Sequence, residues 1–350
     1  MSSCSRALRA ALGAALIVSA PLAAQDSTKT AGPAKPTKLF SSDSIFAITI
    51  ASDMKKFVDT RDSLAPYLPA KLIVAGDTLR VGIRQRGHFR RKTSSCTFPP
   101  VSVKFEKDVK GTVFAKQKKL KLVTTCWPGR AEYEGYIPQE YLLYRVYGLL
   151  TPFSFRARLV RVTYADTTGK GRDAISTLAF FIEDQKDMAA RNAGAPIEGK
   201  NAVRDDFDVP SLALLSLFEY FIGNTDVSFA AQHNIRFVRT EEFGSGIHPV
   251  AYDFDWSGVV NTRYAVPDRS LPIRSVRDRI WMSYCFSAAD LAPAIAIFND
   301  RRPAITALYT ETNVLDKEAA QQTLEYFDAF YKIVNDPARL AKEIKRHCAG

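Results

Sequence analysis

Carboxylate and amide side chains that could carry chemistry gather in three short segments of the second half of the chain. Asn224-Thr225-Asp226 follows a strongly apolar stretch, His233-Asn234 comes next, and Asp253-Phe254-Asp255 comes last. A hairpin between the second and third segments would bring them together at its base, facing the loop that holds the first. Carboxylate and amide oxygens that converge on one place suit a hard cation such as Mg²⁺.

Phosphoryl transfer is the reaction that this set of groups predicts. One aspartate can orient or deprotonate the attacking hydroxyl, while an asparagine and a second aspartate hold the metal that bridges the phosphates. The alternative is structural. Asn224 and Asp226 could simply cap a turn, because Asn and Asp favour turns, and Asp253 and Asp255 could bind backbone amides at the end of a strand.

The first half of the chain is predicted to be rich in strands. Residues 79–86 alternate apolar and polar side chains, the pattern of a half-buried strand, and residues 139–150 repeat Leu and Val at helical spacing. Pro138 fits the first turn of that helix, where its missing N–H does no harm. Further strands are predicted at 101–106, 119–124, 156–164 and 176–183.

The second half of the chain is predicted to be mainly helical. A strongly apolar helix runs from Pro210 to Ile222, with Ser211 as its N-cap and Gly223 as its stop. We therefore predict an α+β, protein-kinase-like fold with a strand-rich N-lobe (45–183) and a mainly helical C-lobe (184–350). The other predicted elements of this half are strands at 234–239 and 249–253 and helices at 288–299, 303–313 and 316–346.

The order of several short motifs resembles the spore coat protein CotH family, an exported branch of the kinase-like fold. The resemblance covers roughly residues 79–260, and the order of the motifs is more specific than any one of them. The matching segments are Arg84-Gln85-Arg86-Gly87, Pro100 to Phe105, Lys118 to Leu122, Glu140 to Arg145, Ala179 to Asp184, Asn224-Thr225-Asp226 and Asp253-Phe254-Asp255.

This resemblance implies an atypical protein kinase that uses ATP with Mg²⁺ or Mn²⁺ to phosphorylate a protein hydroxyl. Asp226 would then be the catalytic aspartate, and Asn234 and Asp253 would be metal ligands. Asp255 is a second candidate ligand, because typical kinases have glycine at that place. Asp226 and Asn234 lie further apart than in the H-R-D-x-x-x-x-N loop, which weakens the assignment of Asn234.

The resemblance also implies the residues that would hold the nucleotide. Lys121 and Lys104 are the two candidates for the lysine that pairs with the phosphates, and Glu140 would position that lysine through an ion pair. Glu183 would lie beside the nucleotide at the junction of the lobes.

No G-x-G-x-x-G loop is present, and Arg86-Gly87-His88-Phe89-Arg90-Arg91 occupies the corresponding hairpin. Arg86 could bind phosphate in place of backbone amides. The alternative is that these arginines form a solvated charged face.

The N-terminus has the pattern of an export signal. Arg6 and Arg9 precede an apolar run, and Leu22-Ala23-Ala24 offers the small residues that a signal peptidase accepts. We expect residues 1–24 to be a signal peptide, residues 25–44 a flexible linker and residues 45–350 the folded domain. No second stretch of transmembrane length is present, so the mature protein is expected to be periplasmic or extracellular.

Four cysteines remain beyond the predicted signal peptide. Cys96 precedes one predicted strand and Cys126 ends another, so neighbouring strands would bring them together as a disulfide. The alternative is that the thiols are free and buried. A structural zinc site is not expected, because no C-x-x-C pair occurs and the four histidines are far apart.

The composition is that of a folded protein with a basic surface. Of the 350 residues, 46% are apolar and 24% charged, and the formal net charge is +11. The charge favours anionic partners, but export argues against nucleic acid. ATP would be scarce outside the cytoplasm, so a non-catalytic envelope or surface module that binds a partner or an anionic ligand is the alternative to a kinase.

Overall fold

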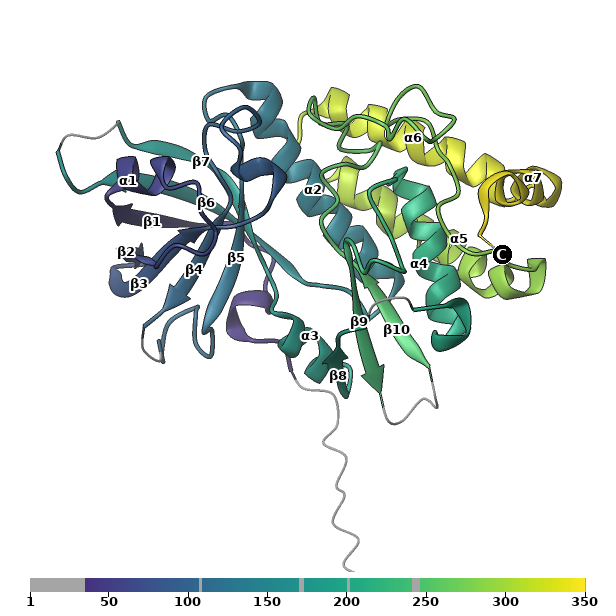
Figure 1. Cartoon of the computed structure of the whole chain (residues 1–350), viewed down its shortest axis with the longest axis horizontal. Helices are drawn as coiled ribbons and strands as arrows, with labels where there is room; N and C mark the ends of the chain where they lie inside the picture. Colours follow the sequence, from purple (N-terminus) through teal and green to yellow (C-terminus); the bar gives the residue numbers. More distant parts are fainter. Residues whose placement is uncertain (1–34, 107–108, 170–172, 200–201, 241–245, 350) are drawn as a thin grey trace, which may run out of the picture. The chain divides into compact units, whose positions relative to one another are not determined.

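A closed β-barrel makes up the first half of the computed structural model, which describes residues 35–106, 109–169, 173–199, 202–240 and 246–349 (Figure 1). Its strands follow each other around the barrel in the order β1-β2-β3-β4-β5-β7-β6. Neighbours are antiparallel, except that β1 and β6 pair in parallel and close the barrel. The strands are β1 (Phe46–Ser52), β2 (Leu68–Val74), β3 (Asp77–Gln85), β4 (Val101–Phe105), β5 (Lys119–Thr124), β6 (Ala157–Asp166) and β7 (Ile175–Ile182).

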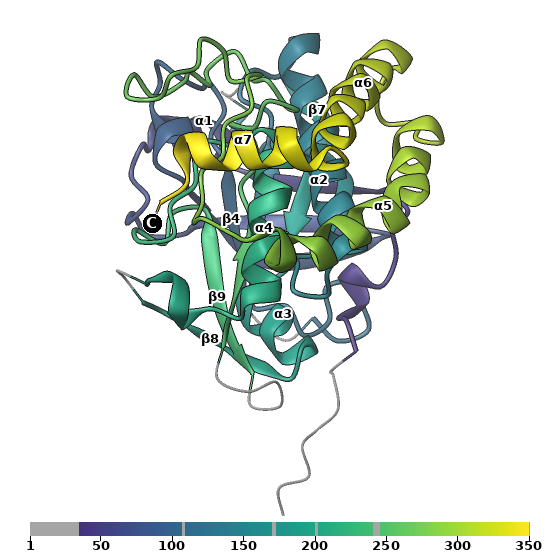
Figure 2. The same cartoon turned by 90° about the vertical axis from the view of Figure 1, so that its right-hand side faces the viewer.

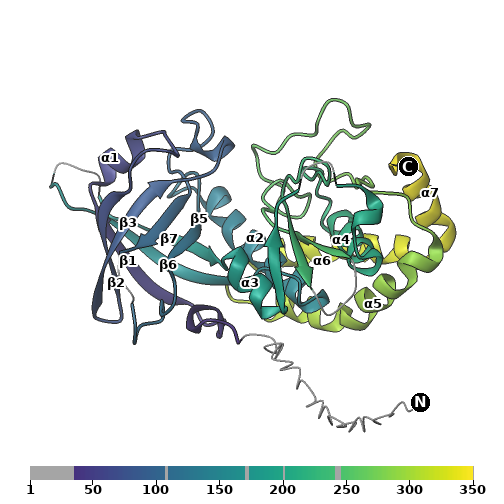
Figure 3. The same ribbon diagram turned by 60° about the horizontal axis from the view of Figure 1, so that its bottom comes forward.

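Alternating burial explains why these segments are barrel strands. In β2, for example, Ala70, Leu72 and Val74 are buried while the residues between them are exposed or half-buried. Figure 3 shows the strands curving around this shared interior. Phe114, from the loop between β4 and β5, is fully buried in the barrel core.

The predicted protein-kinase-like, two-lobed fold is wrong. The strands predicted at 79–86, 101–106, 119–124, 156–164 and 176–183 are confirmed as β3 to β7, but β1 and β2 were not predicted. Because β1 pairs with both β2 and β6, the strands close into a seven-stranded barrel. A separate three-stranded sheet in the order β10-β9-β8 accompanies this barrel.

Seven α-helices and the small sheet complete the described part of the chain. The predicted helix 288–299 and helix 303–313 are one continuous helix, and the predicted helix 316–346 is two helices that break at Asn335 and Asp336. The helices are α1 (Met54–Asp59), α2 (Ala131–Leu150), α3 (Gln185–Arg191), α4 (Val209–Ile222), α5 (Ala288–Thr310), α6 (Lys317–Val334) and α7 (Pro337–His347), and the small sheet is β8 (Gly194–Ile197), β9 (Ile235–Thr240) and β10 (Ile247–Ala251).

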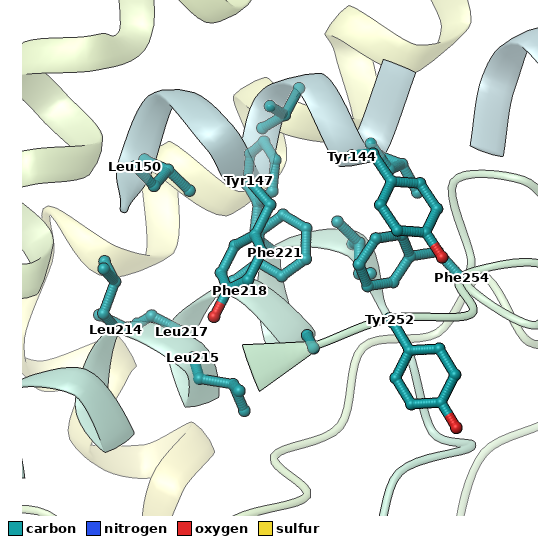
Figure 4. Close-up of a cluster of buried hydrophobic side chains, with 14 of the residues drawn as sticks. Tyr144, Tyr147, Leu150, Leu214, Leu215, Leu217, Phe218, Phe221, Tyr252 and Phe254 are labelled. Atoms are coloured by element: carbon teal, nitrogen blue, oxygen red, sulfur yellow. The ribbon is translucent and has the colours of Figure 1, made fainter. Parts of the chain in front are cut away.

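Helix α4 lies at the centre of the second hydrophobic core (Figure 2). Every residue from Leu212 to Ile222 is buried, which fits a helix that is apolar on all sides. Asp208 caps its N-terminus by accepting from the backbone N–H of Ser211, and Gly223 ends it in the left-handed conformation at φ 65°. Figure 4 shows aromatic side chains of α2 and α4 meeting in this core, where the Tyr147 and Phe218 rings lie 4.4 Å apart.

Two disulfides cross-link the described chain. Cys96–Cys126 is confirmed, and Cys285–Cys348 ties the C-terminal end to the loop before α5. Disulfides persist in oxidising compartments, so both are compatible with export. No helix of the described chain combines the length and the apolar character needed to cross a membrane.

The predicted signal peptide lies outside the described residues, as does the first part of the predicted linker. In the remaining part, Lys38–Phe40 forms a short 3₁₀ helix (η1) with Leu39 and Phe40 buried against the barrel core. Ordered structure therefore begins before Ile45.

Candidate functional site

The end of α4 fixes the loop that carries Asp226. Asn224 is buried, and its amide nitrogen donates to Oε2 of Glu219 at 2.9 Å. Its amide oxygen accepts from the backbone N–H of Asp226 at 3.0 Å. Asn224 therefore links the core helix to Asp226, as its position directly after the helix stop allows.

Both carboxylate oxygens of Asp226 are oriented by neighbouring side chains. Nδ2 of Asn234 donates to Oδ2 at 2.9 Å and also to the backbone oxygen of Asp226 at 2.8 Å. Nε2 of His233 lies 3.0 Å from Oδ1. This hydrogen bond to Asp226 raises the pKa of His233, against the lowering effect of partial burial.

Glu219 lies behind this loop and is buried on all sides. Burial raises its pKa to about 8, against the opposing effect of the hydrogen bond from Asn224. Its Oε1 is buried without a hydrogen-bond partner among the described residues. Glu219 is therefore protonated at neutral pH and supports the Asp226 loop as a neutral group.

The hairpin of β9 and β10 brings Asn234 and Asp253 together, as predicted. The backbone N–H of Tyr252 donates to the carbonyl of Asn234 at 3.1 Å. Asp253 is the next residue after Tyr252, so this hydrogen bond holds it close to Asn234. Asp253 has a left-handed backbone at φ 68°, a conformation that few residues other than glycine adopt. Tyr144 holds that conformation, because its hydroxyl accepts from the backbone N–H of Asp253 at 2.9 Å.

The carboxylate of Asp253 is left without a partner. Within the described part of the chain it accepts no hydrogen bond and joins no ion pair, although it is half-buried. A half-buried charge of this kind is costly unless a ligand compensates it.

Asp255 is engaged by its own chain. Its Oδ2 accepts from the hydroxyl of Tyr264 at 2.8 Å and lies 3.7 Å from Nη1 of the buried Arg90. Burial and the charge of Asp253 raise its pKa to about 6, although Arg90 and Tyr264 act in the opposite direction. These contacts tie Oδ2 of Asp255 to Tyr264 and Arg90.

Glu140 lies deep between the barrel and the Asp253 segment. It is 1% exposed, and its Oε1 has no hydrogen-bond partner among the described residues. Burial and the charges of Asp255 and Asp253 raise its pKa well above the ordinary value. The predicted ion pair between Glu140 and Lys121 does not form among the described residues. The positive charges that lower the pKa of Glu140 are instead those of Arg90 and Arg86.

Two cations lie over the ring of Tyr252, the residue before Asp253. Nζ of Lys121 lies 4.9 Å from the ring centroid and the guanidinium of Arg236 lies 4.3 Å from it. In Figure 4 the Tyr252 ring points away from the core between α2 and α4. Burial, with the charges of Arg86 and Arg236, lowers the pKa of Lys121 to about 8, while Asp253 acts to raise it.

No described carboxylate forms an ion pair with the cations near Tyr252. In the part of the chain that the structure describes, Lys121, Arg86 and Arg236 form no ion pair with a carboxylate. Lys104, the other candidate lysine, is exposed on β4 and lies over Tyr67 instead. Of the two lysines, Lys121 is thus the one close to Asp253.

Glu183 is committed to structural contacts. It is buried, and its carboxylate accepts from Nη2 and Nε of Arg191 at 3.0 and 3.2 Å and from the backbone N–H of Arg156 at 3.1 Å. Its side chain therefore connects the end of α3 to the residue before β6.

Arg236 and Tyr252 are site residues that the sequence analysis did not identify. Arg236 lies near the start of β9, two positions beyond Asn234. Its closeness in sequence to Asn234 was the signal that could have suggested Arg236 as a site residue.

A complete metal site is not formed by the protein alone. Within the described ranges, no three His, Cys, Asp or Glu side chains are arranged to hold a metal ion. Asn234 and Asp253 nevertheless offer an amide oxygen and an unpartnered carboxylate, which fit Mg²⁺ bound to phosphates. Such an ion takes only one or two protein ligands and keeps waters and phosphate oxygens as the others.

Comparison with known proteins gives no relative: no protein-family model and no curated protein matches this chain.

Proposed function

We propose that the protein is an exported phosphotransferase. It binds a nucleoside triphosphate, such as ATP, together with Mg²⁺, and transfers the terminal phosphoryl group to a protein hydroxyl. One observation carries the proposal: the Lys121 ammonium lies over the ring of Tyr252, the residue before Asp253, and is acted on by the charges of Arg86 and Asp253. None of these three charged groups has an ion-pair partner among the described residues. A polyphosphate would compensate the two cations, and its metal would compensate Asp253.

The proposed chemistry assigns a task to each group. Lys121 and Arg86 bind the phosphates, and Arg236 adds positive charge beside them. Asp226, oriented by Asn234 and His233, accepts the proton of the acceptor hydroxyl. As that oxygen bonds to the terminal phosphorus, the bond to the leaving diphosphate oxygen breaks.

Asn234 and Asp253 would hold the magnesium ion. When bound, the ion neutralises charge on the phosphates during transfer. The resemblance of the motifs to the CotH family implies the same chemistry and belongs to this proposal, whereas the predicted kinase-like fold does not.

A turnover assay with a matched acid variant tests the proposal. The oxidised protein is incubated with ATP and Mg²⁺ or Mn²⁺, and ADP release and protein phosphorylation are measured. Asp226→Asn should abolish turnover but leave ATP binding within about threefold, because Asp226 acts on the acceptor. The control Asp77→Asn changes an exposed aspartate at the start of β3 and should leave turnover unchanged. ATP binding without turnover in the wild type, with any acceptor offered, would contradict transfer.

A second candidate is a non-catalytic module that binds an anionic ligand on an envelope or surface partner. Two observations favour it: the described residues form no metal cluster of their own, and both oxygens of Asp226 already accept hydrogen bonds. For this candidate, the anion would bind equally well with and without Mg²⁺, and Asp226→Asn would have no effect on function.

A further inference from the structure

A band of cations crosses four neighbouring strands on the outer surface of the barrel, from β2 to β5. Its side chains alternate along each strand with residues of the barrel interior, so they point outward. Asp77, at the start of β3, is the only carboxylate within these four strands, every residue of which the structure describes. The basic band consists of Lys71 on β2, Arg80 and Arg84 on β3, Lys104 on β4 and Lys119 on β5.

Two pairs of these cations lie directly opposite each other on adjacent strands. Lys71 on β2 is in register with Arg80 on β3. Lys104 on β4 is in register with Lys119 on β5. Side chains in such positions are close neighbours, and like charges there lower the stability of a sheet. Glu106 lies 3.7 Å from Arg80. The three lysines form no ion pair with any described carboxylate, so an anionic partner would relieve their repulsion.

The ring of Tyr67 orients two cations in the middle of the band. The guanidinium of Arg84 lies 4.4 Å and Nζ of Lys104 lies 5.6 Å from the ring centroid. The ring can lie this close to the sheet because residue 82 is glycine, where a Cβ would come within 2.8 Å of Cβ of Tyr67. Its hydroxyl is 3.0 Å from Oγ of Ser102. An aromatic ring attracts cations without neutralising them, so both charges stay in place for an anion.

We propose that the basic band binds an acidic segment of a partner protein in an extended conformation. Glutamate and aspartate carboxylates would complement the opposed lysines and the two oriented cations. The band takes three of the seven steps around the closed barrel, so its side chains point in directions that span nearly half a turn. A flat anionic membrane would touch only part of such a curved band, whereas an extended chain can follow it.

The dimensions of the band set the length of that segment. Adjacent strands are about 4.8 Å apart, so the three steps from β2 to β5 cover about 15 Å at the level of the backbone. Side chains on a convex surface spread further apart than their backbone. An extended chain of ten residues reaches about 33 Å, which is long enough to follow the tips of the side chains from Lys71 to Lys119.

The band ends beside the site around Asp253. Lys121 follows Lys119 by two positions on β5, and its ammonium lies over Tyr252. An acidic segment on the band would therefore lie next to the proposed nucleotide site. Docking on the band does not depend on the proposed function, because the structure places none of the five band residues at that site.

The test uses the full oxidised chain carrying Lys121→Met, so that the first site does not contribute. A fluorescein-labelled peptide of ten glutamates is titrated at constant ionic strength, and its anisotropy is measured. We expect saturable binding that the double variant Lys104→Glu/Lys119→Glu weakens at least tenfold. The matched control Lys332→Glu/Lys345→Glu changes the net charge equally, on exposed lysines of α6 and α7, and should change the affinity less than twofold.

A neutral variant shows whether the fold is kept. Lys104→Gln/Lys119→Gln should weaken peptide binding at least threefold while its melting temperature is unchanged or slightly raised, since the opposed charges are removed. The proposal is overturned if the peptide does not bind, if neither double variant weakens binding, or if the control weakens it as much. Vesicles that contain phosphatidylglycerol are offered in parallel. If they bind and the peptide does not, the band is a membrane-binding surface and the proposal is likewise overturned. Loss of ATP binding or turnover would affect none of these outcomes.

Discussion

The side-chain amide of Asn234 fixes Asp226 twice, by donating to the carboxylate Oδ2 at 2.9 Å and to the backbone oxygen at 2.8 Å. Because the nitrogen of this amide is directed at Asp226, its oxygen is the end left for a cation. One side chain thus connects the proposed proton acceptor to the proposed metal ligands. This contact brings the two side chains together although they are further apart in sequence than in the kinase catalytic loop.

Two lysines on neighbouring strands provide a matched pair of variants. Lys121→Met should weaken ATP binding at least tenfold, because Lys121 lies beside Tyr252 and Asp253 without an ion-pair partner among the described residues. Lys104→Met should leave it unchanged, since Lys104 lies over Tyr67 on the outside of the barrel. Calorimetric titration of both variants checks this, and the reverse result would assign the phosphate to Lys104.

The lowered pKa of Lys121 predicts a specific pH dependence of anion binding. Its pKa is about 8, so the ammonium is charged below pH 8 and loses its proton above it. ATP affinity should therefore fall by up to tenfold for each pH unit above 8. Lys121→Arg should remove this dependence, because arginine stays protonated. The test is to measure the ATP affinity of the wild type and of Lys121→Arg from pH 6.5 to 9.5. If the affinities of both proteins change with pH in the same way, Lys121 is not the titrating group.

Glu219 predicts a pH effect on stability. Its pKa is raised from 4.5 to about 8 on folding, so the folded state binds the extra proton between these values. The contribution of Glu219 protonation to the free energy of unfolding is fully present below pH 4.5 and is lost as the pH rises through 8. Glu219→Gln stays neutral and should remove a slope of about 1.4 kcal/mol per pH unit from the free energy of unfolding between pH 5 and 8. Urea denaturation at several pH values between 5 and 8 measures the free energy of unfolding of both proteins. If this free energy depends on pH equally in both, Glu219 is not protonated in the folded state.

The Cys96–Cys126 disulfide should contribute measurably to stability. It spans 30 residues, and closing a loop of this length stabilises a fold by about 3–4 kcal/mol in the chain-entropy model. The double variant Cys96→Ser/Cys126→Ser should lose this amount relative to the oxidised protein. Denaturation of both without reductant tests it, and equal midpoints would mean that the cross-link does not constrain the unfolded chain.

Local sequence patterns predicted much of this structure. The alternation of residues 79–86, the Gly223 stop of α4 and the polar segments of the hairpin all correspond to elements at the predicted places. The predicted N-cap Ser211 is wrong, because α4 begins at Val209 and Asp208 is its N-cap. Each of these signals depends on neighbouring residues in the chain, which a single sequence displays. The pairing of Cys96 with Cys126 followed from two such strands lying side by side.

The closure of the barrel could not be predicted in this way. It depends on the parallel pairing of β1 with β6, in which Phe46 lies opposite Val160, more than a hundred residues later. No local pattern encodes such a partner. For the same reason the sequence did not distinguish Lys121 from Lys104, because the difference arises from the distant Tyr252.

The most direct measurement of the central claim is ATP binding with and without Mg²⁺ in the wild type and in Asp253→Asn. We predict that Mg²⁺ strengthens ATP binding to the wild type at least tenfold and that the variant loses this dependence, because the negative charge that attracts the cation is removed. The melting temperature of the ligand-free variant should be unchanged or slightly raised, since the unpartnered carboxylate is neutralised. ATP binding that ignores Mg²⁺ in the wild type, or a ligand-free variant that melts far below it, would contradict the account.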